Sequence, residues 1–408
     1  MTRRLLLTSA LAALCLAATL ALFLTRGWVH LGVPHFHPEL RPFTDTKAHL
    51  ETAAGCRIGL GEWQGSACFV PDAVTVPRAQ TYQPWLFLHD LGLLPYQHYS
   101  VVAWVMIVLF WLAYARLAAP DGPRQALVAL LVALTAGVQL GVERGNFDLF
   151  VFVLMAMAAL ALPRRRRAGF AVGTALLAFA TALKLYTGAA TLLSWLAARQ
   201  WHWRAAAISA LMLAAAIAIV GPAELLALGA EAPEGATRFS TGIPWLAQAL
   251  GWPAALALAS VAALSAGVLC WRRCVPLYAA LSRLPPASRT ALHLSAFSAV
   301  PLFALKASYD YRFVIWLPAV LCLLKLASLP GARGIGALSV VLFFLAAGME
   351  LPLSQIEHWS QTSLDFAASG TVQGLVLLKQ LSALLLAALI GSLSLVDLYG
   401  TYRQRSTA

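Results

Sequence analysis

Long apolar segments return at intervals along the 408 residues of the chain, and they limit its fold more than any other feature. A helix needs about 17 to 25 mostly apolar residues to cross a bilayer, and the first such segment covers residues 5–24. Sixty per cent of all residues are hydrophobic and only 11% are charged, which is typical of membrane proteins. The sequence therefore predicts an all-α polytopic membrane protein and not a soluble domain.

Twelve segments are predicted to cross the membrane, so that residues 1–408 form a single integral membrane domain. They are residues 5–24, 100–119, 125–141, 147–162, 168–183, 187–198, 205–222, 253–271, 290–305, 313–329, 334–349 and 371–397. The region 168–198 is short for two passes. We expect two short helices hinged at Lys184 to Gly188, because interrupted helices are tolerated at membrane depth where they line a polar cavity.

Arginine follows every second apolar segment, which predicts the topology. The positions are Arg3 and Arg4, Arg116 and Arg124, Arg164 to Arg167, Arg199 and Arg204, the stretch from Arg272 to Arg289, Arg333, and Arg403 and Arg405. Basic residues concentrate in short cytoplasmic loops. We therefore expect a bacterial cytoplasmic (inner) membrane protein with both termini in the cytoplasm. The net charge of +12 is explained by topology, so no nucleic-acid partner is expected.

This topology places three longer loops, residues 25–99, 223–252 and 350–370, outside the membrane. The first is rich in aromatic residues, and we expect it to fold into short amphipathic helices lying on the outer membrane surface. Its Tyr82, Trp85, Tyr96 and Tyr99 form either an interfacial aromatic belt or a platform for a sugar.

Two further residue pairs in the first loop are candidates for a disulfide and for a metal site. Cys56 and Cys68 lie on the oxidising side and form a disulfide, or else remain two free thiols. His35 and His37 are spaced to bind a metal together if the chain is extended, but no third ligand follows at a strong spacing. We therefore predict no metal and no other cofactor.

Three polar clusters stand at the outer ends of apolar segments. They cover residues 143–148, 184–186 and 308–312. A single charge at a membrane boundary is ordinary, because long side chains extend to the headgroups. Three mixed-charge clusters on the same face as a large loop indicate a polar functional site.

Five short stretches carry a resemblance to a known family. They are Phe43-Thr44-Asp45 through Gly59, Tyr82-Gln83-Pro84-Trp85, Glu-Arg-Gly-Asn-x-Asp at 143–148, Leu-Lys-Leu-Tyr at 183–186, and Tyr-Asp-Tyr-Arg at 309–312. With these motifs in this order, the chain resembles membrane glycosyltransferases of the GT-C superfamily, most closely glycosyltransferase family 87. The resemblance implies that a polyprenyl-phosphate donor gives a mannose-like hexose or a pentose to a lipid, glycan or protein acceptor outside the membrane.

The resemblance also implies a catalytic base, since one carboxylate must take the proton of the attacking hydroxyl. Asp45 matches the first-loop position of that base, and Glu51 is the second candidate. Here the carboxylate is single and not paired, and Gln83 precedes Pro84 where the family motif reads closer to Asn-Tyr-Pro-Pro. Both departures leave the catalytic assignment open. Asp45 is equally well placed to begin a helix as its N-cap.

The donor's phosphate requires cations, ideally arginine. The candidates are Arg144, Lys184, Lys306 and Arg312, each of which could instead reach the headgroups or, for Arg312, pair with Asp310. The candidate substrate-binding residues are Glu143, Asn146, Asp148, Tyr186, Tyr309, Asp310, Tyr82 and Trp85.

Two other functions compete with the enzyme. A polytopic transporter or lipid flippase of the cell envelope would also need many spans, and a structural partner in an envelope assembly is a third possibility. A transporter requires polar residues along a path through the membrane. The predicted span interiors hold few polar residues beyond Gln139, Glu224 and Lys379, which disfavours such a path.

Overall fold

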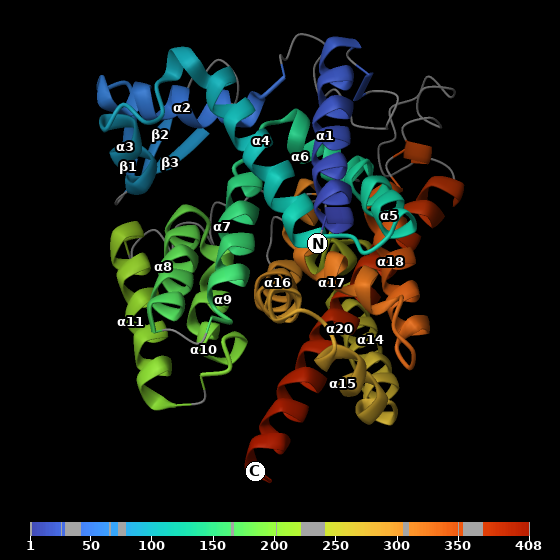
Figure 1. Cartoon of the computed structure of the whole chain (residues 1–408). Coiled ribbons are helices and arrows are strands. Elements are labelled where there is room, and N and C mark those ends of the chain that lie inside the picture. Colours follow the sequence, from blue (N-terminus) through green and yellow to red (C-terminus); the bar gives the residue numbers. More distant parts are fainter. Residues whose placement is uncertain are drawn as a thin grey trace.

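The computed structural model is a bundle of helices with a small α/β unit at one end (Figure 1). It describes residues 2–25, 27–28, 42–64, 67–71, 79–164, 167–200, 202–221, 241–304, 310–349, 351–353 and 370–407. The all-α polytopic architecture predicted from the apolar segments is confirmed, because helices that could span a membrane make up the body of the molecule.

Six described stretches are long and apolar enough to cross a membrane. Five of them are built on α1 (Thr2–Thr25), α4 (Tyr99–Ala118), α11 (Trp203–Val220), α14 (Trp252–Arg272) and α20 (Gly370–Ser406), and the sixth begins with α18 (Arg333–Gly348). A seventh is the pair α5 (Pro123–Ala133) and α6 (Ala136–Glu143), if the two are counted as one span bent by 60°.

The remaining predicted spans are helical, and most of them are shorter or interrupted. They correspond to α7 (Asp148–Ala161), α8 (Arg167–Leu183), α9 (Gly188–Leu192) with α10 (Ser194–Ala197), α16 (Pro286–Ala304), and the 3₁₀ helix η4 (Asp310–Trp316) with α17 (Leu317–Leu326). Two helices, α13 (Ile243–Leu250) and α15 (Cys274–Ser282), lie outside the predicted spans.

At two of the breaks in the helices, side chains inside the protein satisfy backbone carbonyls that the break frees. Between α5 and α6, the Gln139 side chain donates to the Ala133 carbonyl at 2.8 Å and accepts from the Trp28 indole at 3.2 Å. After α8, Lys184 is extended and the 3₁₀ helix η3 (Leu185–Thr187) leads into α9. The predicted hinge at Lys184 to Gly188 is therefore confirmed.

The first loop contains a small sheet that was not predicted. Strands β1 (Glu62–Gln64), β2 (Ala67–Val70) and β3 (Ala79–Tyr82) pair antiparallel in that order. Two helices, α2 (Thr44–Arg57) and α3 (Gln83–Asp90), pack with the strands. The prediction of short helices in this loop was thus incomplete, because it omitted the sheet. We call residues 44–90 the α/β unit.

A disulfide between Cys56 and Cys68 ties the end of α2 to β2, with the two Cα atoms 6.1 Å apart. The predicted bridge is confirmed, and the alternative of two free thiols is wrong. Both cysteines lie in the unit's own apolar core with Ala53 and Leu86. Glycine at position 61 allows the backbone to lie directly against the disulfide, since a Cβ there would lie 2.1 Å from the Cys68 sulfur.

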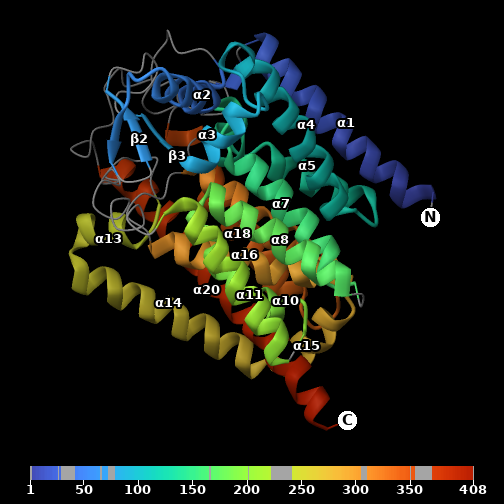
Figure 2. The same ribbon diagram turned by 90° about the vertical axis from the view of Figure 1, so that its left-hand side faces the viewer.

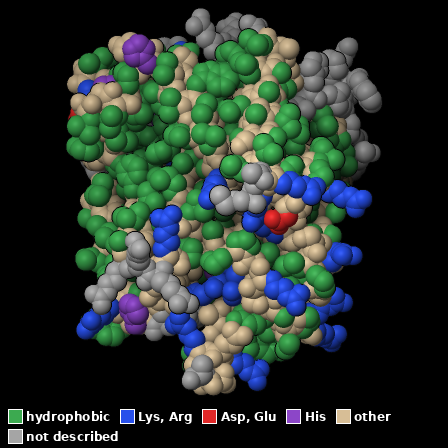
Figure 3. Space-filling model, in the orientation of Figure 1, with side chains coloured by type: hydrophobic (Ala, Val, Ile, Leu, Met, Phe, Trp, Pro, Cys, Tyr) green, Lys and Arg blue, Asp and Glu red, His purple; other side chains and the backbone are tan. Residues whose placement is uncertain are grey.

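The surface of the bundle agrees with a membrane environment. Large apolar side chains such as Leu211 on α11 and Leu264 on α14 are exposed, as expected where helices face lipid. Lys and Arg gather on the lower half of the face shown in Figure 3. Both termini lie away from the α/β unit (Figure 2).

Candidate functional site

The turn between α6 and α7 is clamped against the start of α2. Phe43 N–H donates to the Glu143 carbonyl at 2.8 Å, and Asp45 N–H donates to the Arg144 carbonyl at 3.0 Å. The Thr46 hydroxyl donates to the Gly145 carbonyl at 2.5 Å. Gly145 has φ +57°, and a Cβ there would lie 2.6 Å from that hydroxyl oxygen, so only glycine allows this approach.

Asp45 lies at the centre of this contact. Its Oδ1 accepts from Arg144 Nε at 2.9 Å and from the terminal guanidinium nitrogen at 2.5 Å, and its Oδ2 accepts from Asn146 Nδ2 at 2.5 Å. The N-cap of α2 is Phe43, in a left-handed conformation and without a side-chain cap. Because the Asp45 carboxylate is engaged by Arg144 and Asn146, the alternative that it caps the helix is wrong.

The surroundings of Asp45 keep it ionised. Burial raises the pKa of its carboxyl, but the charge of Arg144 and the hydrogen bonds from Arg144 and Asn146 outweigh burial, so the pKa lies below its ordinary value. At neutral pH this carboxylate is negatively charged and accepts hydrogen bonds only.

A second carboxylate, Asp148, stands at the first turn of α7 and is fully buried. Its Oδ1 accepts from the Tyr186 hydroxyl at 2.8 Å and lies 3.9 Å from Lys184 Nζ. Asn146 Oδ1 accepts from the Asp148 N–H at 2.8 Å, which connects this carboxylate to the Asp45 contact. Among the described residues, no hydrogen-bond partner is found for the other oxygen, Asp148 Oδ2.

Arg312 reaches the same place from η4, which packs against α6 and α7. Its guanidinium carbon lies 5.9 Å from the centroid of the Tyr186 ring, within the range of a cation–π contact. The predicted residues Asp45, Arg144, Asn146, Asp148, Lys184, Tyr186 and Arg312 are therefore brought together, with Glu143 buried at the end of α6 beside them. We call this set the outer cluster.

His49 belongs to the outer cluster, although the sequence analysis did not single it out. It follows Asp45 by four residues, a spacing that places both on one face of a helix. Burial lowers the pKa of His49 to about 4, and the charge of Lys184 adds to the effect while that of Asp45 opposes it. The imidazole is therefore neutral at physiological pH.

Trp85 packs inside the α/β unit and does not offer an open ring face. It is 2% exposed, its ring lies 4.0 Å from that of Phe147, and it stacks on His49 at 5.7 Å. The predicted roles of Trp85 as a sugar platform or as part of an exposed belt are wrong, because the ring is an internal contact between the unit and Phe147, which precedes α7.

Glu51 points away from the side of α2 that carries Asp45. It lies six residues after Asp45 on α2, which turns its side chain about 240° around the helix. Lys306 and Tyr309 lie outside the described residues, and for Tyr82 and Asp310 only the backbone is described. Their predicted roles, and the Asp310–Arg312 pair, remain predictions.

The described residues contain no group of three or more His, Cys, Asp and Glu side chains that could hold a metal ion. The predicted histidine pair, His35 and His37, lies outside the described residues. Whether the protein uses a metal therefore remains a prediction.

The opposite end of the bundle holds a charged cluster that the sequence analysis missed. Asp397 on α20 accepts from Arg289 Nε at 2.9 Å, from Arg199 at 3.3 Å and from His293 Nε2 at 2.9 Å. The His293 Nδ1 lies 2.7 Å from the Ser394 hydroxyl. We call these residues the inner cluster. From the sequence, Arg199 and Arg289 are only topology signals at the ends of predicted spans. Because 108 residues separate Arg289 from Asp397, no local pattern indicates that the two are paired.

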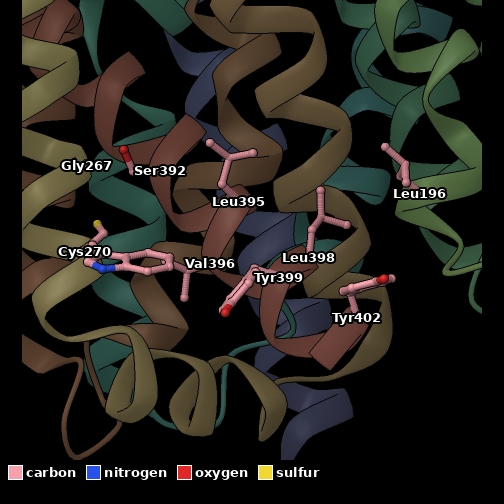
Figure 4. Close-up of a pocket in the computed structure, with 10 residues that line it drawn as sticks. Leu196, Gly267, Cys270, Ser392, Leu395, Val396, Leu398, Tyr399 and Tyr402 are labelled. Carbon is pink, nitrogen blue, oxygen red and sulfur yellow. The ribbon is translucent and has the colours of Figure 1, made fainter. Parts of the chain in front are cut away.

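A cavity of about 480 Å³ lies near the inner cluster, between α14 and α20. Figure 4 shows its lining, in which Leu395, Val396, Leu398 and the rings of Tyr399 and Tyr402 come from α20. The lining contains no carboxylate and no cation. It therefore lacks the groups that acid–base chemistry or anion binding would need.

Comparison with known proteins gives little further information. No family model matches the chain, and no curated protein matches it. A solved structure, the crystal structure of ArnT from Cupriavidus metallidurans in the apo state, aligns with 94% of this chain and 78% of its own at 13% identity and a TM-score of 0.37. A likeness this weak assigns neither a detailed fold nor an activity, so the resemblance to glycosyltransferase family 87 stays a prediction.

Proposed function

We propose that the chain is a membrane glycosyltransferase that takes a sugar from a polyprenyl-phosphate donor. The observation that carries the proposal is the outer cluster. There the ionised carboxylate Asp45 pairs with Arg144, and the cations Lys184 and Arg312 lie beside Asp148 and Tyr186 at the ends of membrane helices. Transfer from such a donor needs both kinds of group, a base for the acceptor hydroxyl and cations for the departing phosphate.

In this proposal Lys184 and Arg312 bind the donor's phosphate. The ammonium of Lys184 lies 3.9 Å from Asp148, beyond a normal hydrogen bond, so it can turn towards an anion at small cost. Arg144 directs its Nε and one terminal nitrogen at Asp45. We therefore assign Arg144 a positioning role and leave the phosphate to the other two cations.

Asp45 accepts the proton of the acceptor hydroxyl while that oxygen bonds to the anomeric carbon and the sugar–phosphate bond breaks. The phosphate leaves with the bonding electron pair, and Lys184 and Arg312 stabilise the added charge. A carboxylate of low pKa is a weak base towards a free hydroxyl. Proton transfer is therefore expected late, once bond formation has made the hydroxyl acidic. Glu51, the alternative base, lies on another side of α2.

We place the outer cluster outside the cytoplasm of a bacterium, with both termini inside. Two observations support this. The Cys56–Cys68 disulfide lies in the same unit as Asp45, and disulfides persist in oxidising compartments. Lys and Arg gather towards the other end of the molecule, as expected of the cytoplasmic side.

The proposal is tested with the full-length protein in lipid nanodiscs, using polyprenyl-phosphate hexose and pentose donors with lipid, glycan and protein acceptors. Wild type should transfer sugar from one of these donors, and Asp45→Asn should reduce the rate by about a hundredfold or more. Asp90→Asn is the matched control, because Asp90 is an exposed carboxylate of the same unit that pairs with Arg57. Absence of transfer from every donor would overturn the proposal.

A transporter or lipid flippase is the second candidate, and the inner cluster is the observation that favours it. Buried charges at both ends of a bundle are expected along a transport path. Asp397 is nevertheless fully buried and its carboxylate accepts from three side chains, which fits a fixed contact better than a changing one. Flux of labelled lipid across proteoliposomes, without sugar transfer, would favour this candidate.

A further inference from the structure

A second pocket, lined in part by cations, opens at the arginine-rich end of the bundle. It lies away from the outer cluster and beside the inner cluster, since its lining residue Ser288 directly precedes Arg289. Its volume is about 420 Å³, and it lies where α1, α4, α7, α16 and α17 begin or end. Three cations line it: Arg4 from the start of α1, Arg116 from the last turn of α4 and Lys325 from the last turn of α17. No carboxylate is among the lining residues.

Lys325 makes this pocket more than a group of surface charges. The side chain is almost wholly buried at 5% exposure, and its Nζ donates to the Leu117 carbonyl and to the Ser288 hydroxyl, each at 3.0 Å. Both partners are neutral, and an ammonium has three donors. One N–H of a buried cation therefore remains beyond these two contacts, and burial of a charge is costly unless an anion pairs with it.

The charge balance of the pocket also favours an anion. Arg4 lies 3.4 Å from Asp121, an exposed carboxylate, which partly offsets its charge. Arg116 and Lys325 form no ion pair within the part of the chain that the structure describes. The pocket thus carries a surplus of positive charge at the depth where helices end and lipid headgroups lie.

We propose that this pocket binds the phosphate of an anionic phospholipid, with Arg116 and Lys325 contacting the phosphate. The bilayer is favoured over the aqueous phase as the source because the pocket wall includes Leu5, which is 60% exposed on the apolar surface of α1. Basic pockets between membrane helices are suited to acidic lipid headgroups. The site lies at the end of the molecule opposite the outer cluster, and its occupancy does not depend on sugar transfer.

The test measures lipid retention by native mass spectrometry of the full-length protein in detergent, titrated with dioleoyl phosphatidylglycerol or dioleoyl phosphatidylcholine. Phosphatidylglycerol should bind more tightly. Arg116→Gln should weaken its binding about fivefold, which corresponds to about 1 kcal/mol per basic residue near a membrane surface. Arg403→Gln is the matched control, since Arg403 is exposed near the same end on α20 and does not line the pocket.

Lys325→Met gives a second, larger test, because it removes the buried cation and keeps an unbranched side chain. We expect a loss of about tenfold or more. If this variant fails to fold, Arg4→Gln and Arg116→Gln together test the same contact. Equal binding of the two lipids, or an equal loss for Arg403→Gln, would overturn the proposal. Displacement of the lipid by millimolar inorganic phosphate would overturn the lipid as the natural source of the anion.

Discussion

The outer and inner clusters are built on the same interaction and differ in what surrounds it. In the outer cluster Arg144 Nε donates to Asp45 at 2.9 Å, and in the inner cluster Arg289 Nε donates to Asp397 at 2.9 Å. Both arginines add a second bond from a terminal nitrogen to the same carboxylate oxygen. A charge-assisted pair of this kind is strong. It therefore does not by itself distinguish a functional site from a structural contact.

The difference lies in access and in the neighbouring charges. The Asp397 side chain is 0% exposed, and Arg199 and His293 complete its contacts. In the outer cluster the side chains of Arg144 and Asp45 are 22% and 11% exposed, and Lys184 is only loosely paired. The inner cluster holds α16 against α20, whereas the outer cluster joins a loop unit to three helix ends. Arg199 and Arg144 are similarly exposed, so the difference in access lies in the carboxylates: that of Asp397 is closed to a ligand, whereas that of Asp45 is partly open.

The largest effect that would separate the clusters is on stability. Asp397→Asn removes the negative charge of the inner cluster and leaves Arg289 and Arg199 without a counter-charge among the described residues. Breaking a buried pair in this way costs about 3 to 5 kcal/mol, so the midpoint of heat unfolding should fall by several degrees. Asp45→Asn should cost much less, because Arg144 can turn to water. Scanning fluorimetry of both variants in one detergent gives the comparison. An equal loss of stability would show that the outer pair is also structural.

Loss of the Cys56–Cys68 disulfide should disturb the outer cluster and leave the inner cluster unchanged. Cys68→Ser, or a reductant that reaches the bridge, releases a loop that closes over twelve positions. A disulfide closing a loop of this size contributes about 3 kcal/mol in the chain-entropy model. We expect faster hydrogen exchange in α2 and weaker sugar transfer, with no change in exchange around α20. Cys270→Ser is the control, since Cys270 is a free thiol of α14. Unchanged exchange in α2 would mean that packing alone holds Asp45.

How well the sequence predicted each region depends on how far apart along the chain the interacting residues lie. Helix positions came from apolar runs, which are local, and the outer cluster came from the helix ends that topology brings to one face. The sheet was missed because β1 spans only Glu62–Gln64, too short for an alternating pattern to show. The inner cluster pairs Arg289 with Asp397 across 108 residues, so only tertiary packing reveals it. His49 did carry a signal, its spacing of four from Asp45.

Loss of the Lys184 ammonium, which is only loosely paired with Asp148, should lower turnover. If Lys184 stabilises the departing phosphate, Lys184→Ala should lower the rate of transfer by about ten- to a hundredfold, the equivalent of roughly 1.5 to 3 kcal/mol for a charged hydrogen bond. Lys184→Arg should restore part of the rate because the charge returns in another geometry. Arg57→Ala, which removes an exposed cation of the α/β unit, should have little effect. A change in donor affinity with unchanged turnover would contradict a role in the transition state.

The smallest expected effect is a loss of order in the α/β unit at mildly acidic pH. Burial lowers the pKa of His49 from 6.5 to about 4. Between about pH 6.5 and pH 4 the His49 imidazole is protonated in the unfolded unit but not in the folded unit. The folded unit therefore loses stability as the pH falls from about 6.5 towards 4. Asp45 contributes nothing in this window, because its pKa is lowered below its ordinary value and its stabilisation is lost only under more acidic conditions. Hydrogen exchange of α2 at pH 7 and pH 5 measures the effect. The variant His49→Gln cannot titrate, so its exchange should depend on pH no more than that of α20 does. The same acid-induced exchange in His49→Gln would assign it to another group and would remove the imidazole from the account of the outer cluster.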